Sequence, residues 1–109
     1  MSDITEIVAA YKPERFISLN IPLDDLQNYL TLSHSEAKIL NILLREYRAH
    51  KGQFGARAIR QHIFSMRKKL YYRFEDEIIE NSGMGIYSVS DLNKGVINGY
   101  INAVKELNK

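Results

Sequence analysis

The side chains best suited to chemistry in this chain are cationic, and they are concentrated in one stretch. Residues 45–73 hold nine lysines and arginines against a single acid, Glu46, so this stretch carries a net charge of +8. The remaining 80 residues carry −6, which leaves the whole chain near neutral at +2. Because the counter-charges lie elsewhere, the pattern favours a surface that binds a polyanion over an ordinary solvated helix face. The nine residues are Arg45, Arg48, Lys51, Arg57, Arg60, Arg67, Lys68, Lys69 and Arg73.

We predict a helix from about Arg57 to Tyr72 with two chemically different sides. Four apolar residues at helical spacing form the expected core side: Ile59, Ile63, Met66 and Leu70. The opposite side carries the candidate contact residues Arg57, Gln61, Phe64 and Lys68, flanked by Arg60 and Arg67. The major groove of duplex DNA admits one α-helix, where arginine suits guanine, glutamine suits adenine and lysine suits phosphate. The sequence therefore predicts a recognition helix, on which Phe64 would contact a thymine methyl group or a protein partner.

Motifs of catalysis or metal binding do not stand out. The chain has no phosphate-binding loop, no H-E-x-x-H motif and no G-x-S-x-G turn, and a turn explains Gly83-Met84-Gly85 best. The lack of cysteine excludes disulfides and thiolate metal sites. Acidic groups at 24–25 and 75–77 are typical of exposed helix starts and loops. Three histidines lack metal-ligand spacing and are expected to be structural: His34, His50 and His62. We expect no enzymatic activity, no cofactor and no metal.

Local signals place the elements that precede the basic helix. Asp3 and Glu6 predict a capped first helix that Pro13 ends, and residues 16–21 read as a short strand or extended segment. A short helical turn follows Pro22. The next helix begins with an S-x-x-E capping box, Ser33 to Glu36, and we expect Lys51-Gly52 to end it. Its apolar stripe is Ile39, Leu40, Leu43, Leu44 and Tyr47.

The elements after the basic helix are a hairpin and a final helix. We expect a first strand at Ile78-Ile79, a polar turn at residues 80–82 and a second strand over residues 86–90. Tyr71 and Tyr72 either reach nucleic acid or pack, half-buried, under this hairpin. Asp91 or Asn93 is the expected cap of the last helix. The apolar stripe of that helix is Val96, Ile97, Tyr100, Ile101, Val104 and Leu107.

Three segments resemble the OmpR/PhoB-type response-regulator output domain. "LSHSEAKILNILL" (32–44) is similar to its opening helix, "AIRQHIFSMRKKL" (58–70) to its recognition helix and "IIENSGMGIYSVS" (78–90) to its closing wing. The resemblance implies a winged helix-turn-helix that binds promoter DNA, usually as a dimer. It also implies roles for eight residues. Arg60, Gln61 and Phe64 would face bases with Arg57 at the helix entrance, Arg67 and Lys68 would lie towards bases or phosphates, and Met84 and Ile86 would flank the wing tip.

The chain also departs from that family's pattern. The loop from about Arg48 to Ala56 is shorter than the stretch that holds the family's positioning helix, so that helix is expected to be reduced or missing. The wing has one residue more between Gly85 and Tyr87. Only about 30 residues precede the resembling region, so we expect a stand-alone regulator without a receiver domain.

The sequence thus predicts a mainly α protein with a small β-hairpin (α+β), a winged helix-turn-helix. It is expected to be a single domain over 1–109, with an N-terminal extension (1–30), a winged-helix core (31–90) and a C-terminal helix (91–109). We expect a cytoplasmic, sequence-specific transcriptional regulator that binds double-stranded DNA, not a membrane. Apolar stripes on the first and last helices suggest a homodimer, and contact with RNA polymerase is a further expectation. The alternatives are a winged-helix adaptor for polymerase or another regulator, and a non-specific architectural DNA-binding protein.

Overall fold

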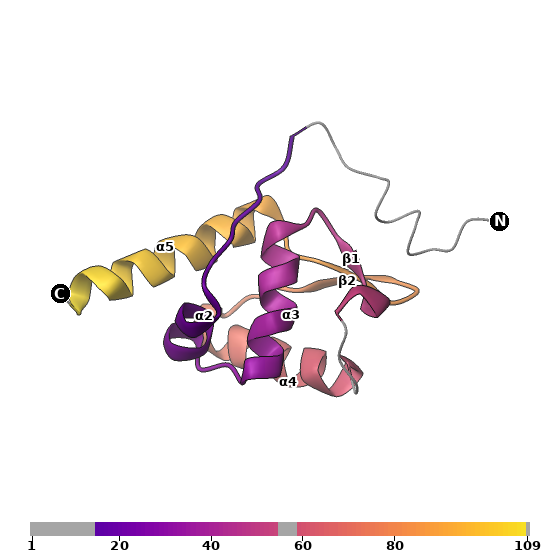
Figure 1. The fold of residues 1–109 in the computed structure, drawn as a ribbon, viewed down its shortest axis with the longest axis horizontal. Coiled ribbons are helices and arrows are strands. Elements are labelled where there is room, and N and C mark those ends of the chain that lie inside the picture. The colour runs from indigo at the N-terminus through magenta and orange to yellow at the C-terminus, as the bar shows by residue number, and fades with distance from the viewer. Residues whose placement is uncertain (1–14, 55–58, 109) are drawn as a thin grey trace.

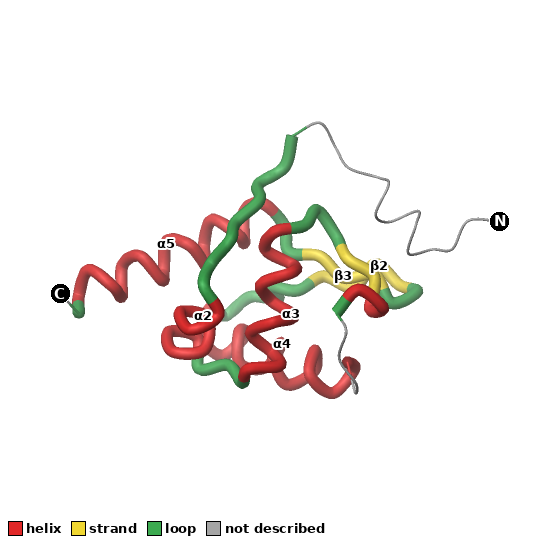
Figure 2. Tube along the Cα trace, in the orientation of Figure 1, coloured by secondary structure: helices red, strands yellow, loops and turns green. Residues whose placement is uncertain are grey.

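The computed structural model describes residues 15–54 and 59–108, and within them it is mainly helical with one small antiparallel sheet, as the sequence predicts. Four α-helices and a short 3-10 turn (Lys51–Gln53) are described (Figures 1 and 2). The helices are α2 (Leu23–Leu30), α3 (His34–Arg45), α4 (Ile59–Phe74) and α5 (Asp91–Leu107). The strands are β1 (Ala49–His50), β2 (Glu80–Gly83) and β3 (Ile86–Ser88). The helix predicted from Asp3 to Pro13 lies outside the described residues.

The predicted capping box at the start of α3 is confirmed. The Ser33 hydroxyl accepts a hydrogen bond from the Glu36 amide, and a Glu36 carboxylate oxygen accepts one from the Ser33 amide. The predicted end of this helix is wrong, because α3 stops at Arg45 and not at Lys51-Gly52. The chain turns extended there so that Ala49 and His50 can pair with β3. Because the pairing partner lies far along the chain, the residues around Arg45 carry no local sign that the helix ends there.

The hairpin forms, but its strands are displaced from the predicted positions. Ile78 and Ile79 are buried in the core and precede the first strand, and the segment expected to be a polar turn, 80–82, belongs to β2. The turn itself is Met84-Gly85, and both residues have positive φ, of 56° and 76°. Two consecutive left-handed residues are typical of a tight hairpin turn, for which glycine is well suited. The sheet order is β1-β3-β2, with β3 in the centre.

The core gathers around α3, which lies between the other elements in Figure 1. Residues 16–21 are extended and run beside α3 without joining the sheet, held by a 2.9 Å hydrogen bond from the Leu19 amide to the Leu44 carbonyl. The cap of α5 is Ser90, not Asp91 or Asn93, since its side chain accepts from the Asn93 amide. The largest fully buried apolar side chains are Leu26, Leu30, Ile39, Leu40, Leu43, Leu44, Met66, Leu70, Ile79, Ile97 and Ile101.

A lysine in α5 is buried within this core. The Lys94 ammonium donates hydrogen bonds to the carbonyls of Ile17 (2.6 Å) and Glu46 (2.9 Å), and it lies 5.3 Å from the centre of the Phe16 ring. Burial lowers the pKa of Lys94 below its ordinary value of 10.5, against the charge of the nearby Asp91 and Glu46, which acts to raise it. This cation joins the N-terminal segment and the end of α3 to α5.

Candidate nucleic-acid interface

The inward side of α4 is the one predicted from its apolar spacing. Ile63, Met66 and Leu70 are buried and Ile59 is partly buried. They anchor α4 to the core, and their spacing fixes which side of the helix faces solvent. His62 lies at the edge of this stripe and is half-buried, as expected.

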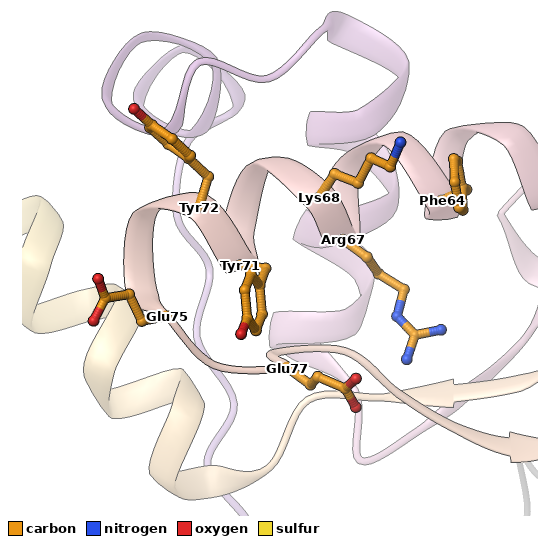
Figure 3. A pocket seen from close by; sticks show the side chains of 7 residues that line it. All are labelled: Phe64, Arg67, Lys68, Tyr71, Tyr72, Glu75 and Glu77. Carbon is orange, nitrogen blue, oxygen red and sulfur yellow. The ribbon is translucent and has the colours of Figure 1, made fainter.

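The outward side of α4 carries the predicted contact residues that the structure describes. Arg60, Gln61, Phe64 and Lys68 are exposed, and Arg67 is partly exposed. Figure 3 shows the side chain of Phe64 on one turn of the helix and those of Arg67 and Lys68 on the next, pointing to different sides. The Lys68 ammonium lies 4.5 Å from the centre of the Phe64 ring, which is 62% exposed. This cation–π contact keeps an aromatic surface and a positive charge together on the solvent side. Arg57 lies outside the described residues.

Two other cations of the basic stretch have partners within the protein, and the first is Lys69. Its ammonium lies 2.6 Å from a carboxylate oxygen of Glu36, which is only 2% exposed. Burial acts to raise the pKa of Glu36, but hydrogen bonds from Lys69 and Ser33 outweigh it and leave this pKa below its ordinary value of 4.5. The carboxylate that caps α3 therefore also fixes α4 against α3.

The second of these cations is Arg73, in the last turn of α4, which is exposed but has partners within the protein. Its guanidinium donates hydrogen bonds to the Thr31 hydroxyl (3.0 Å) and to the Tyr100 hydroxyl, and it lies 5.3 Å from the centre of the Tyr100 ring. Phe74 packs edge-on against the same ring at 5.3 Å. These contacts tie the end of α4 to the α2–α3 corner and to α5, so Arg73 is occupied within the fold.

The outward cations have no such partners. Among residues 15–54 and 59–108, the ion pairs are Lys69–Glu36 and Lys105–Asp25, and none involves Arg60, Arg67 or Lys68. The basic stretch is therefore divided. Lys69 is neutralised by Glu36 and Arg73 is held by two neutral hydroxyls, whereas Arg60, Arg67 and Lys68 on the solvent side of α4 are left for an external anion. The sequence analysis placed Lys68 on the contact side and gave Lys69 no role in binding, but it did not predict the Glu36 partner of Lys69.

The C-terminal half of α4 has a different character. An open groove of about 870 Å³ lies along it, lined by Phe64, Arg67, Lys68, Tyr71, Tyr72, Glu75 and Glu77. Figure 3 shows Tyr71 and Tyr72 pointing away from each other on this part of the helix. They are 57% and 89% exposed, so of the two alternatives for these tyrosines, packing half-buried under the hairpin is wrong. The nearby Glu75 and Glu77 would repel phosphates, which limits an anion-binding face to the earlier turns of α4.

The hairpin turn presents one of its two predicted residues to solvent. Met84 is 79% exposed, whereas Ile86, which pairs with His50 across the sheet, is half-buried. Lys51 was not among the predicted site residues. Its amide donates to the Gly85 carbonyl at 2.7 Å, and the nearest of its side-chain carbons, Cδ, lies 2.9 Å from where a Cβ on Gly85 would stand. An exposed cation thus lies against the hairpin turn.

The remaining candidates for chemistry have structural partners. His34 Nδ1 lies 3.4 Å from the Gln27 side-chain oxygen, and His50 Nδ1 accepts from the Gly52 amide at 3.1 Å. Within the described ranges, no group of three or more histidine and acidic side chains lies close enough to hold a metal ion. None of the described helices combines the length and apolar character needed to cross a membrane.

The fold and this surface define a small α+β protein with a cationic, partly aromatic helix face beside a hairpin. Comparisons with known protein families, with characterised proteins and with solved structures found no match to this chain. Its function is therefore argued from its own residues.

Proposed function

We propose that this protein is a sequence-specific, double-stranded DNA-binding transcriptional regulator of the winged helix-turn-helix type. The succession of α3, basic α4 and the β2–β3 hairpin is the order that a winged helix requires. In this proposal α4 is the recognition helix and the hairpin is the wing. The 3-10 turn at Lys51–Gln53 occupies part of the stretch where a positioning helix would stand.

The observation that carries the proposal is the division of the cations on α4. Lys69 pairs with the Glu36 carboxylate and Arg73 donates hydrogen bonds to the Thr31 and Tyr100 hydroxyls. Within the described residues, Arg60, Arg67 and Lys68 have no carboxylate partner and lie on the solvent side. Unpaired cations on a rigid helix suit the phosphates and base edges of a duplex, because they pay no cost for breaking internal ion pairs. The buried Glu36–Lys69 pair would hold the helix orientation during binding.

Each exposed residue has a role that its chemistry fits. Arg60 suits the two acceptors of guanine and Gln61 suits adenine, while Lys68 suits a phosphate as a point charge. Phe64 offers an apolar surface to a thymine methyl group. Met84 and Lys51 at the hairpin turn would lie against the neighbouring backbone or minor groove.

The test is a salt titration of duplex binding, with matched lysine variants. The logarithm of the binding constant should fall linearly with the logarithm of salt concentration, by about 0.9 for each phosphate contacted. Lys68→Ala should reduce that slope by about 1. Lys38→Ala removes the same charge from an exposed position on α3 and should leave the slope unchanged. No saturable binding to duplex DNA at low salt would contradict the proposal.

Selection from a random duplex pool then separates a regulator from an architectural protein. An enriched motif supports sequence-specific binding by Arg60 and Gln61. Retention of DNA without enrichment supports the non-specific alternative.

An adaptor function is a second candidate, and the exposed tyrosines favour it. Tyr71 and Tyr72 lie beside Glu75 and Glu77 in the open groove, a mixture that suits a partner protein better than DNA. Such a partner, for example RNA polymerase, would bind the C-terminal half of α4. If Tyr72→Ala abolishes regulation but leaves duplex affinity unchanged, both surfaces function; if the wild-type protein binds no DNA, the adaptor function alone remains.

A further inference from the structure

Large apolar side chains exposed to solvent fall into two groups. One group lies on α4 and the hairpin turn: Phe64, Tyr71, Tyr72 and Met84. The other belongs to α5 and the segment bound to its first turn: Leu92, Val96, Leu107 and Ile17. Ile17 is joined to that turn through its backbone, since its amide donates to the Asp91 carboxylate at 3.0 Å and its carbonyl accepts from Lys94. The second group has no place in the proposed DNA interface.

These α5 residues form one continuous seam along the helix. The α5 seam consists of five exposed residues at spacings of four, three, four and four: Leu92, Val96, Gly99, Ala103 and Leu107. At about 100° per residue they cover only about 80° of the helix circumference, opposite the buried Ile97 and Ile101. None of the five carries a charge or a polar side chain. A Cβ on Gly99 would meet nothing within 4 Å, so the centre of the seam is open to a close approach.

The four outer residues of the seam are symmetric about its middle, and this symmetry fits a second copy of the same helix as the partner. Leu92 and Leu107 are equally far from the midpoint of the seam, next to Gly99, and so are Val96 and Ala103. Two copies of α5 related by a twofold axis beside Gly99 would therefore pair antiparallel. Leu92 of one copy would meet Leu107 of the other, and Val96 would meet Ala103. An interface in which residue i meets j, and j meets i, is the form that a twofold dimer requires.

We propose that the α5 seam binds the α5 seam of a second copy of this chain in an antiparallel helix pair. The seam carries no like charges to repel its copy, and the glycine at the axis lets the two backbones approach. In Figure 1, α5 runs to the end of the molecule opposite the hairpin turn, so pairing leaves the hairpin and the outward side of α4 accessible in both copies.

The size of the seam predicts a weak dimer. A 17-residue helix is about 25 Å long, and two such helices bury less than the roughly 1,200 Å² typical of stable complexes. We therefore expect reversible association that depends on protein concentration. The interface should respond strongly to a charge placed at its axis.

Sedimentation equilibrium of the full chain without DNA tests the proposal. Wild type should pass from monomer to dimer with rising concentration, and Gly99→Lys should weaken association by at least about 100-fold, since each lysine faces its own copy. Asn102→Lys, an exposed position about 100° from the centre of the seam, should associate like wild type. Lysine is a better helix former than glycine, so Gly99→Lys should keep the thermal midpoint or raise it.

Single cysteines test the antiparallel register in this cysteine-free chain. When Val96→Cys and Ala103→Cys are mixed and oxidised, the disulfide between the two variants should exceed either self-linked product. Predominant self-linked Val96→Cys would contradict the antiparallel pairing.

Two results would overturn the proposal outright. One is a wild-type protein that remains monomeric at all concentrations, in which case residues 1–14 or another protein would have to cover the seam. The other is equal association by Gly99→Lys and wild type. Neither result bears on DNA binding, because association is measured without DNA, and loss of duplex binding would likewise leave the dimer untouched.

Discussion

α4 and α5 are the two longest helices described, with 16 and 17 residues, and both bury an apolar stripe in the same core. Their outward sides differ. The solvent side of α4 carries the polar Arg60, Gln61 and Lys68 beside exposed aromatic residues, whereas the α5 seam has no polar side chain. The two buried stripes are alike, so they explain how the helices fold together but not which molecules each helix binds. The outward residues suggest that α4 binds a polyanion and that the apolar seam of α5 binds the same seam of a second copy.

The largest effects should come from the stripes that the two helices share. Met66 in α4 and Ile97 in α5 both have no solvent exposure. Truncating either one to alanine should lower the free energy of unfolding by about 2–5 kcal/mol, because a cavity remains in the core. Urea denaturation measures both losses. A loss below about 1 kcal/mol at one position alone would mean that its helix packs less tightly than the other. That result would contradict the equal burial of the two stripes.

The next effect separates two adjacent lysines on α4. Lys69→Met leaves the buried Glu36 carboxylate without its ion pair, and we expect a loss of about 2–3 kcal/mol in unfolding free energy. Lys68→Met removes an exposed charge and its contact with the exposed Phe64 ring, but no buried partner, and should change stability by less than about 0.5 kcal/mol. Equal losses in urea denaturation would mean that the Glu36–Lys69 pair does not anchor α4.

The faces of α4 were predictable because they depend only on helical spacing. Ile63, Met66 and Leu70 are buried where the 3.6-residue period puts them, and the Ser33–Glu36 capping box is local as well. The same period places Lys69 beside the buried stripe and Lys68 opposite it. That signal was available in the sequence, but the partner of Lys69, 33 residues earlier, was not.

Features that depend on distant contacts could not be predicted. The end of α3 at Arg45 follows from the pairing of Ala49 and His50 with β3, about 37 residues later. The burial of Lys94 requires two carbonyls from separate segments, at Ile17 and Glu46. From sequence alone, a lysine near the start of a helix is predicted to be exposed. Its burial is tolerated only when distant residues accept its hydrogen bonds, and the local sequence does not reveal them.

A smaller effect should distinguish the outward faces in binding. Alanine at Arg60 or Gln61 should cost about 1–3 kcal/mol in discrimination at one base pair of the selected motif. Leu92→Ala, on the α5 seam, should change no base preference. Competition binding with single-base variants of the motif measures both. An altered base preference in Leu92→Ala would place α5 in the DNA interface. It would contradict the assignment of DNA binding to α4 alone.

The fall in unfolding free energy at acid pH should depend on the Glu36 carboxylate, which pairs with Lys69 of α4. The pKa of Glu36 is lowered in the folded protein, so its contribution is fully present above its unfolded pKa of about 4.5. It is lost as the pH falls through the lowered folded value, where the carboxylate gains a proton. Glu36→Gln should be less stable at neutral pH and should show a shallower decline in acid. Urea unfolding at pH 3 to 6 measures this, and an unchanged acid slope in Glu36→Gln would contradict it.

The buried ammonium of α5 should act at the opposite end of the pH scale. The folded pKa of Lys94 lies below its ordinary value of 10.5, so between those two values the unfolded chain binds more protons than the folded one. Stability should therefore gain a positive contribution as the pH rises through that window. Lys94→Met removes this gain, although it also leaves the Ile17 and Glu46 carbonyls unpaired and so lowers stability at every pH. The decisive quantity is thus the slope of unfolding free energy against pH in the range just below 10.5. A smaller slope in Lys94→Met than in wild type is expected, and identical slopes would mean that the ammonium holds its proton equally well in both states.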